Sequence, residues 1–299
     1  MKFTIKDFKA RFQTDRDCLE FIFQTRYPDG GTCEKCGHKD CFHPVTNRRS
    51  YACAWCGFQL YATEGTVFHK SSTSLLSWFF AMFLITASKN GVAAKELERQ
   101  LGVTYKTAWR MAHQIRKLMR GSDAILTGTV EADETYLGGI RPGKRGRGAA
   151  GKTPVFGLVE RGGNVHAQVV PDVKAKTLMP AITAKVEAGA TLCTDELGSY
   201  NAATQAGYQH ERVCHNLQEY ARGNAHTNTI DGFWSQLKRS IHGTFHHVSR
   251  QHSQKYVNEF VYRYNLRKSE TPIFQSLTER VAERHVPKGR RTPCGPFPF

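Results

Sequence analysis

The sequence predicts a multidomain protein in which two small modules precede a larger α/β domain built on a mixed sheet. Three observations lead to this prediction. Two CxxC pairs lie near the N-terminus, a helix-glycine-helix pattern follows them, and from about Ile125 the hydrophobic periodicity changes from helical to alternating. A chain of 299 residues is long enough for two or three domains. We expect an N-terminal helical segment, two modules, one larger domain and a loosely ordered tail, over residues 1–30, 31–70, 71–121, 122–275 and 276–299.

The composition points to a globular protein with a polyanionic partner. Hydrophobic residues make up 40% of the chain and charged residues 23%, which is typical of a folded domain. Lys and Arg together number 42 against 26 for Asp and Glu, so the formal net charge is +16. Such a balance favours nucleic acid as the partner, although a generally basic surface is the alternative.

The sequence argues against a membrane protein and against export. The most apolar stretch, LLSWFFAMFLITA over residues 75–87, is too short to cross a bilayer and suits a buried helix. The N-terminal MKFTIKDFKARFQ lacks the apolar core of a signal peptide, so we expect a cytoplasmic protein. The nine cysteines are then better suited to metal binding than to disulfides.

The first module contains two similar cysteine turns. The turns are CEKCG and CAWCG, and their four thiols belong to Cys33, Cys36, Cys53 and Cys56. Tetrahedral zinc takes four thiolates, and two such turns brought together by a hairpin supply them. We therefore predict a zinc ribbon whose closed site holds a structural Zn²⁺. Three residues between the pairs are lower-ranked substitute ligands: His38, Cys41 and His43.

The second module has the pattern of a helix-turn-helix. In GVAAKELERQLGVTYKTAWRMAHQIRKLMR, residues 91–120, apolar residues recur at near-helical spacing, Gly102 ends the first helix and Thr104 can cap the second. The second helix is basic and would present three side chains to a major groove: Tyr105, Lys106 and Arg110. The alternative is an ordinary helical hairpin that links two domains.

The third module alternates strands with helices. ILTGTVEADETYLGGI, PVFGLVE and VHAQVV read as three strands, and TLMPAITAKVEAG reads as a helix. ATLCTDE is a fourth strand, LGSYNAATQAG a helix, HERVCHN a short fifth strand, and HTNTIDGFWSQLKRSI opens a last helix. This element order is that of the ribonuclease-H-like α/β fold, with a mixed five-stranded sheet flanked by helices.

Three aspartates fall on separate elements of this domain. Asp133 lies in the first strand, Asp195 at the end of the fourth, and Asp231 near the start of the last helix. Carboxylates placed this way can converge at one edge of the sheet, although clustering them there is costly because like charges repel and lose hydration. Divalent ions such as Mg²⁺ and a DNA phosphate would remove that cost and support phosphodiester chemistry.

Neighbouring acids offer alternatives to the first two aspartates. Glu131 shares a strand face with Asp133 and could be the ligand instead. Glu134 points to the other face and is expected to be solvated, and Glu196 beside Asp195 is expected to be uninvolved.

Asp231 also has a structural interpretation. Asn228 could be the N-cap of the last helix, with Asp231 as its reciprocal capping partner. Lys238 lies about two turns further along the same helical face, where it could meet a phosphate or simply be a surface lysine.

Taken together, these segments resemble the zinc-ribbon insertion-sequence transposases of bacteria, within the DDE superfamily. The resemblance extends from RYPDGGTCEKCG to EFVYRYNLRK, and its most specific parts are VEADETYLGG and HTNTIDGFW. It implies an enzyme dependent on Mg²⁺ or Mn²⁺ that binds the terminal inverted repeats of its element. Such an enzyme cleaves there and joins the freed 3′-OH to target DNA.

The resemblance also assigns residues. Asp133 and Asp195 match the first two catalytic acids of the family, and Lys238 matches a lysine of its last motif. Asp231 stands where the third acid is usually Glu. Some members have a non-acidic third residue, so Asn228 remains a lower-ranked candidate.

The basic segment RPGKRGRGAAGK, residues 141–152, is expected to contact DNA phosphates through Lys144, Arg145 and Arg147. Because two element ends must be joined, we expect at least a homodimer on double-stranded DNA, on the bacterial nucleoid. Two other functions stay open: a DNA-binding protein derived from a transposase that has lost catalysis, and a ribonuclease-H-like nuclease.

Overall fold

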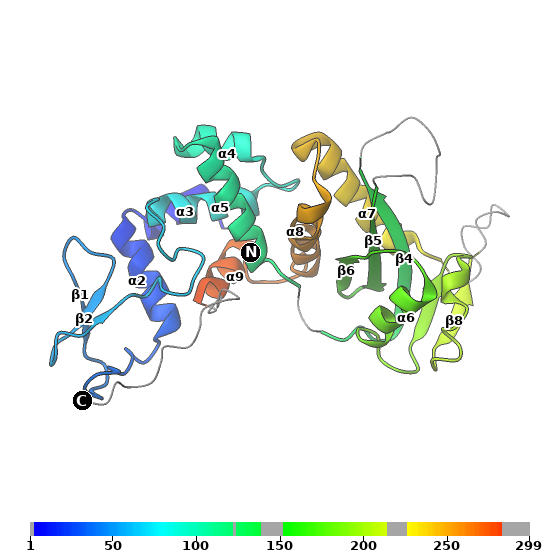
Figure 1. The fold of residues 1–299 in the computed structure, drawn as a ribbon, viewed down its shortest axis with the longest axis horizontal. Helices are drawn as coiled ribbons and strands as arrows, with labels where there is room; N and C mark the ends of the chain where they lie inside the picture. Colours follow the sequence, from blue (N-terminus) through cyan, green and yellow to red (C-terminus); the bar gives the residue numbers. More distant parts are fainter. Residues whose placement is uncertain (1–2, 122–123, 139–151, 214–225, 283–299) are drawn as a thin grey trace, which may run out of the picture. The chain divides into compact units, whose positions relative to one another are not determined.

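The computed structural model describes residues 3–121, 124–138, 152–213 and 226–282 (Figure 1). The chain forms two compact units, each with its own core. One comprises the described residues between 88 and 270, and the other combines residues 3–87 with residues 271–282. The three basic residues predicted to contact DNA from the segment 141–152, Lys144, Arg145 and Arg147, lie outside the described residues.

The unit formed by residues 3–87 and 271–282 has a helical part with an aromatic core. Its helices are α1 (Ile5–Arg11), α2 (Asp15–Arg26), α3 (Leu75–Ala87) and α9 (Ile273–Glu279), followed by the 3₁₀ turn η5 (Arg280–Ala282). Both α1 and α2 begin with a capping box in which a threonine and an aspartate three residues later bond reciprocally. Residues 276–282, which were expected to belong to the tail, are part of α9 and η5, because Phe274 and Leu277 of α9 are buried and α9 packs on α3.

The same unit carries a small antiparallel sheet. Its strands are β1 (Phe42–Pro44), β2 (Tyr51–Cys53) and β3 (Gln59–Leu60), in the order β1-β2-β3. Tyr51 anchors the sheet on α2: its ring stacks on Phe23 at 4.0 Å and its hydroxyl donates to Glu20 Oε2 at 2.6 Å. The turn that begins at Cys33 precedes β1, and the turn that begins at Cys53 follows directly from β2.

The second unit begins with two helices joined by a short turn. These are α4 (Ala94–Leu101) and α5 (Tyr105–Leu118). Gly102 ends α4 with a φ of 64°, in the left-handed region that favours glycine. The hydroxyl of Thr104 accepts from the Thr107 amide at 3.3 Å and so caps α5. Both local predictions for this region are confirmed.

The larger sheet is mixed and has five strands within the described residues. They are β4 (Thr129–Leu137), β5 (Thr153–Glu160), β6 (Val165–Val169), β7 (Thr191–Thr194) and β8 (Gln209–Arg212), in the order β6-β5-β4-β7-β8. β4 is antiparallel to β5 and parallel to β7. The predicted mixed sheet is therefore confirmed. Ala132 is the register partner of Thr194, so Asp195 leaves β7 directly beside Asp133 and Glu134.

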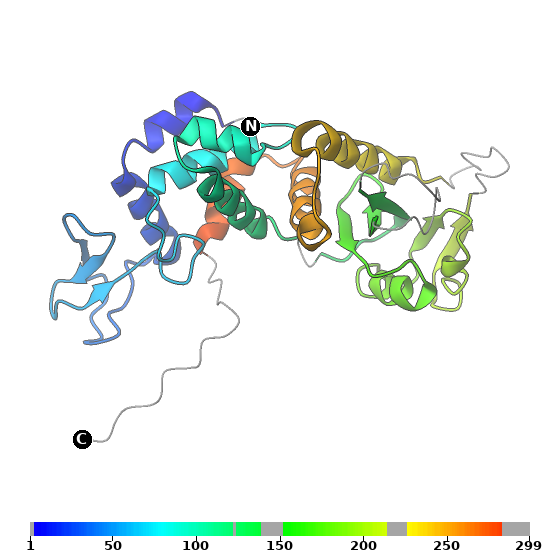
Figure 2. The same cartoon turned by 45° about the horizontal axis from the view of Figure 1, so that its top comes forward.

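Helices cover both faces of this sheet (Figure 2). The helices are α6 (Ala175–Thr183), α7 (Asn228–Ser240) and α8 (Ser253–Asn265), and the short turns are η1 (Gly198–Tyr200), the π-helical η3 (Ile241–Phe245) and η4 (Arg250–His252). Apolar residues of α6 and Tyr200 share a core with one face of β4 and β5. α7 and α8 share a second core with β5 and β6 on the other face. Among the described residues, every helix is too short or too polar to cross a membrane.

A buried ion pair joins α5 to α8. Glu259 is completely buried and accepts from Arg116 Nε at 2.7 Å and from Arg263 Nη2 at 2.8 Å. Burial alone would raise the pKa of Glu259, but the charges of Arg116 and Arg263 outweigh it and hold this pKa below its ordinary value. α4 and α5 are thereby fastened to the domain that contains the large sheet.

Candidate functional site

The structure brings the four predicted zinc ligands together. Sγ of Cys33 lies 3.6 Å from Sγ of Cys56, and Sγ of Cys36 lies 3.6 Å from Sγ of Cys53. Tetrahedral zinc with bonds of about 2.3 Å separates its thiolates by about 3.8 Å, so the cluster fits a structural Zn²⁺. The two turns match: the amides of Gly37 and Gly57 donate to the first cysteine of each pair at 2.9 Å.

The substitute ligands lie outside this four-thiol group. Cys41 Sγ is 3.4 Å from Cys53 Sγ, but the Cys41 thiol also lies within hydrogen-bonding reach of the His38 carbonyl, at 3.3 Å. The ring of His38 stacks on Trp55 at 4.5 Å, and His43 is an exposed residue of β1. Cys41 thus lies next to the cluster at Cys53, while the four cysteines of the two turns form the group whose thiols all lie within reach of one ion.

Removing the zinc is expected to unfold the ribbon. We expect Cys33→Ser to lower the zinc content from one ion per chain to near zero and to abolish the proteolytic resistance of residues 31–60, because metal binding supplies much of the folding free energy of such small sites. Metal analysis and limited proteolysis measure both. Cys193→Ser is the matched control, since Cys193 lies in the large sheet, and zinc retained at full occupancy by Cys33→Ser would contradict the assignment.

The predicted contact residues of α5 share one exposed face. Tyr105, Lys106 and Arg110 are all exposed. Trp109, which was not among the predicted contacts, is also exposed, and its ring stacks on that of the buried His113 with the ring centroids 3.9 Å apart. Its position four residues after Tyr105 is the sequence signal that could have found it.

Asp133 is held in place from α7. The indole Nε1 of Trp234 donates to Asp133 Oδ2 at 2.9 Å. Gly157, opposite Asp133 on β5, makes room for that ring: a Cβ at Gly157 would lie 2.5 Å from Trp234 Cζ2. Burial, together with the charges of Glu134, Asp231 and Asp195, raises the pKa of Asp133 to about 7.

Asp195 and Glu134 complete a compact carboxylate cluster with Asp133. One oxygen from each of the three residues lies within 4.8 Å of the others. Asp195 Oδ1 accepts from the Leu197 amide at 3.0 Å, and Glu134 Oε2 accepts from the Tyr200 hydroxyl at 3.0 Å. The prediction that Glu134 is solvated is wrong: only 8% of it is exposed. Strand alternation predicted that Glu134 points to the opposite face from Asp133, but β7 ends beside these two residues, and the Asp195 carboxylate lies close to both of theirs.

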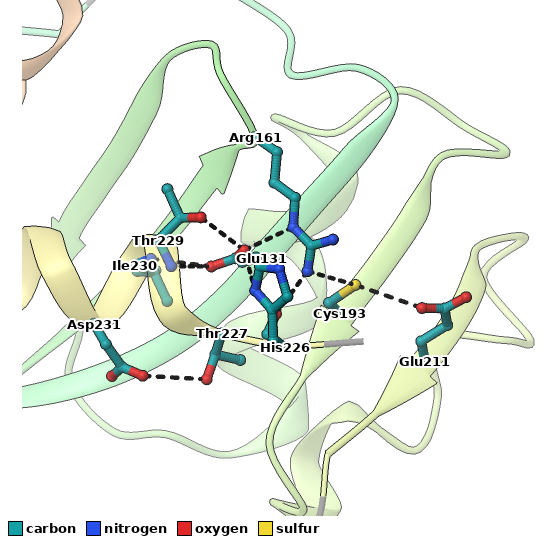
Figure 3. A network of polar contacts seen from close by, with 9 residues as sticks. All are labelled: Glu131, Arg161, Cys193, Glu211, His226, Thr227, Thr229, Ile230 and Asp231. Carbon is teal, nitrogen blue, oxygen red and sulfur yellow. Dashed lines mark hydrogen bonds and ion pairs between the residues drawn. The ribbon is translucent and has the colours of Figure 1, made fainter. Parts of the chain in front are cut away.

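Asp231 lies outside the group of three carboxylates, although its charge contributes to the raised pKa of Asp133. It is exposed in the first turn of α7, and its Oδ2 accepts from the Thr227 hydroxyl at 3.3 Å (Figure 3). The N-cap of α7 is Thr227 and not Asn228, so the predicted Asn228 and Asp231 capping pair does not form. Lys238 is exposed near the other end of α7.

The carboxylate of Glu131, the alternative to Asp133 as a metal ligand, accepts hydrogen bonds from several protein groups. It is completely buried, and its oxygens accept from Arg161 Nε at 2.7 Å, from the Thr229 hydroxyl at 2.9 Å, and from the Thr229 and Ile230 amides at 2.8 and 3.0 Å (Figure 3). A carboxylate offers about four lone-pair sites, so these donors leave little capacity for a metal ion.

Two clusters with different metal preferences therefore lie on one chain. Four thiols suit zinc, while three carboxylates suit a hard divalent ion such as Mg²⁺ or Mn²⁺. The fold and these clusters define a class of protein that combines a small zinc ribbon with a mixed-sheet domain whose acids can hold a divalent ion.

Comparison with known proteins identifies the family. Residues 125–265 match the ISXO2-like transposase domain, and residues 13–59 match the transposase zinc-ribbon domain. The chain is 30% identical to an uncharacterized transposase-like protein of Haemophilus influenzae over 117 residues, which cover 38% of this chain and 94% of that protein. It therefore belongs to the zinc-ribbon insertion-sequence transposases of the DDE superfamily.

A longer alignment gives the same result. The chain is 26% identical over 271 residues to an uncharacterized protein in transposable element ISH50 of Halobacterium salinarum. This alignment covers 84% of the present chain and 91% of that protein. The resemblance inferred from the cysteine pairs and acidic motifs is thus confirmed along most of the chain.

Proposed function

We propose that this transposase binds the terminal inverted repeats of an insertion sequence and catalyses metal-dependent DNA strand cleavage and strand transfer. The observation that carries the proposal is the convergence of Asp133, Glu134 and Asp195 within 4.8 Å in a chain of net charge +16. Such a cluster of carboxylates raises the free energy of the folded protein unless cations bind to it, and a basic surface can hold a polyanion over it. The strand order, with the central β4 antiparallel on one side and parallel on the other, supports a ribonuclease-H-like fold.

The catalytic ions in this proposal are Mg²⁺ or Mn²⁺. Asp133 and Asp195 would hold them, with Asp231 as the third acid of the family pattern, and Glu134 is the additional carboxylate within reach. When bound, the ions supply activation of the attacking oxygen and stabilisation of the leaving oxygen. Trp234 orients Asp133 through its indole hydrogen bond, and Tyr200 orients Glu134. Lys238 would contact a phosphate.

DNA recognition is assigned to the α4 and α5 helix-turn-helix. Tyr105, Lys106, Trp109 and Arg110 give its second helix an exposed face that combines positive charge with aromatic rings. Basic side chains bind phosphates, while aromatic and arginine side chains can contact bases. The partner is double-stranded DNA, and joining two ends calls for at least two copies of the chain on it.

The role of Asp231 is tested by cleavage of short duplexes that carry the element's own ends. We expect Asp231→Ala to lower the Mg²⁺-dependent cleavage rate by roughly a hundredfold, because a ligand or close electrostatic partner of the ions is lost. Asp231→Glu is expected to stay active, since Glu is the usual residue there. Asn228→Ala tests the lower-ranked candidate on the same helical turn, and Ser235→Ala, a change at an exposed position of α7, is the matched control.

Two outcomes would contradict this proposal. Specific binding without cleavage by the wild type, with activity only in Asp231→Glu, would indicate a DNA-binding derivative of a transposase. Cleavage without any joined product would indicate a nuclease of similar fold.

A further inference from the structure

We propose that Glu131 is a positioning residue that holds the first turn of α7, and with it Asp231, against the strand that carries Asp133. This inference rests on the proposed function, because it gives a role to the helix that bears the third acid. It concerns a residue that the sequence left as an alternative metal ligand, and whose two oxygens accept from Arg161, Thr229 and Ile230.

The first support is the direction of the hydrogen bonds. The N-terminal amides of an α-helix have no partners within the helix and need acceptors from elsewhere. The N-cap residue of α7, Thr227, makes no side-chain cap, and its hydroxyl is bonded to Asp231 instead. Glu131 supplies the missing acceptor from β4: its Oε2 accepts from the amides of both Thr229 and Ile230.

The second support is the charge balance around Glu131. A buried carboxylate needs a cation or several donors to be tolerated. Arg161 Nε lies 2.7 Å from Oε1, and His226 Nδ1 lies 3.1 Å from the same oxygen. Arg161 Nη2 also donates to the His226 carbonyl at 2.9 Å, so the residue that leads into α7 is held by the same network. The positive end of the helix dipole favours a carboxylate at this place as well.

The third support is the way these contacts limit the movement of α7. Asp231 directly follows Ile230, whose amide is bound to Glu131. One turn further along, Trp234 binds Asp133. Glu131 and Asp133 lie two residues apart on the same face of β4, so α7 is attached to one strand at two points. Sliding or rotation of α7 would break both attachments and would move the Asp231 carboxyl relative to the other acids.

The test measures Mn²⁺ affinity by calorimetry and amide hydrogen exchange in the full-length protein, together with duplex cleavage. We expect Glu131→Gln to weaken Mn²⁺ binding and slow cleavage by about 10- to 100-fold, the usual effect of losing a residue that orients metal ligands. Duplex affinity should stay within about twofold of wild type, since no predicted DNA contact changes. Exchange protection at residues 229–232 should fall while that of β5 is retained.

Glu131→Asp addresses the possibility that Glu131→Gln does not fold. Aspartate keeps the charge for Arg161 but is one methylene shorter and is not expected to reach both α7 amides. The same loss of protection and Mn²⁺ affinity is therefore expected. Glu259→Gln is the matched control: Glu259 is equally buried and paired with arginines, but it contacts α5 and α8 instead of the first turn of α7.

The outcomes separate this inference from the proposed function. If Asp133→Asn loses Mn²⁺ binding while both Glu131 variants bind Mn²⁺ as tightly as wild type, the positioning role is wrong and the metal site stands. If Asp133→Asn binds Mn²⁺ like wild type, the metal site itself is wrong. A loss in the Glu131 variants no larger than in Glu259→Gln would also overturn the positioning role, since general destabilisation would then account for it.

Discussion

Replacing Asp133 with Asn is expected to lower the rate of metal-dependent DNA cleavage by about a thousandfold. Asn keeps the size of the side chain and can still accept from the Trp234 indole, but it removes the charge that a divalent ion requires. Loss of several kcal/mol of charge stabilisation in the transition state corresponds to a rate change of this order. Single-turnover cleavage of a labelled terminal duplex at saturating Mg²⁺ measures the effect.

Binding of the same duplex provides the control for this prediction. Asp133→Asn should bind DNA about as well as wild type, because Asp133 lies on β4 and the proposed DNA contacts lie on α5. Glu187→Gln, which removes an exposed acid from the same unit, should cleave normally. If binding collapsed together with cleavage in Asp133→Asn, the acid would be structural.

The raised pKa of Asp133 predicts an unusual pH dependence in the metal-free protein. With a pKa of about 7 in the folded state and an ordinary value of 3.8 when unfolded, Asp133 holds its proton more tightly in the folded protein. Its ionisation therefore destabilises the fold progressively as the pH rises from about 4 to about 7. At pH 8 and without metal, Asp133→Asn should accordingly melt at a higher temperature than wild type, and Mg²⁺ should narrow this difference by stabilising the wild type.

Replacing Glu259 with Gln is expected to have the largest effect on stability. This change leaves two arginines, Arg116 and Arg263, beside a neutral group in a buried site. Breaking a buried ion pair on one side typically costs about 3–5 kcal/mol. Urea unfolding followed by tryptophan fluorescence should show a markedly lower midpoint for the unit of residues 88–270.

The control for Glu259→Gln is the same substitution at Glu96, which pairs with Arg99 on the exposed surface of α4. Glu96→Gln should change the free energy of unfolding by about 0.5 kcal/mol or less and so move the midpoint very little.

The contribution of Glu259 to stability depends on pH in a defined direction. Because its folded pKa lies below the ordinary 4.5, the contribution is complete above about pH 4.5 and decreases as the pH falls through the folded value. Equal midpoints for the two variants at neutral pH would refute the role of the buried pair.

Local sequence signals were sufficient for most of the elements themselves. The exception is LGSYNAATQAG, which was predicted to be a helix but forms only the 3₁₀ turn η1 followed by hydrogen-bonded turns. The capped turn of α4 and α5, the strands of the mixed sheet and the cysteine turns all depend on short-range patterns, such as Gly102 in the left-handed region and matched glycines after each CxxC pair. The net charge then indicated a nucleic-acid partner, and the spacing of the cysteine pairs and of the acids indicated metal sites. Residues 276–282 were assigned to the tail because Phe274 and Leu277 of α9 are buried by residues at the other end of the chain, including Phe8, Phe12 and Phe83.

The arrangement of the acids is what the tertiary structure alone decided. In sequence, VEADETYL contains three acids whose strand alternation made Glu131 a rival ligand and Glu134 a solvated residue. In the fold, the Glu131 carboxylate accepts hydrogen bonds from the amides of α7 and from Arg161. The end of β7 brings Asp195 beside both Asp133 and Glu134. The sequence by itself determined which residue types and local elements are present, because those depend on neighbours in the chain. Which carboxylates face one another depends on strand register and on a helix about 100 residues away, and only the packed fold sets these.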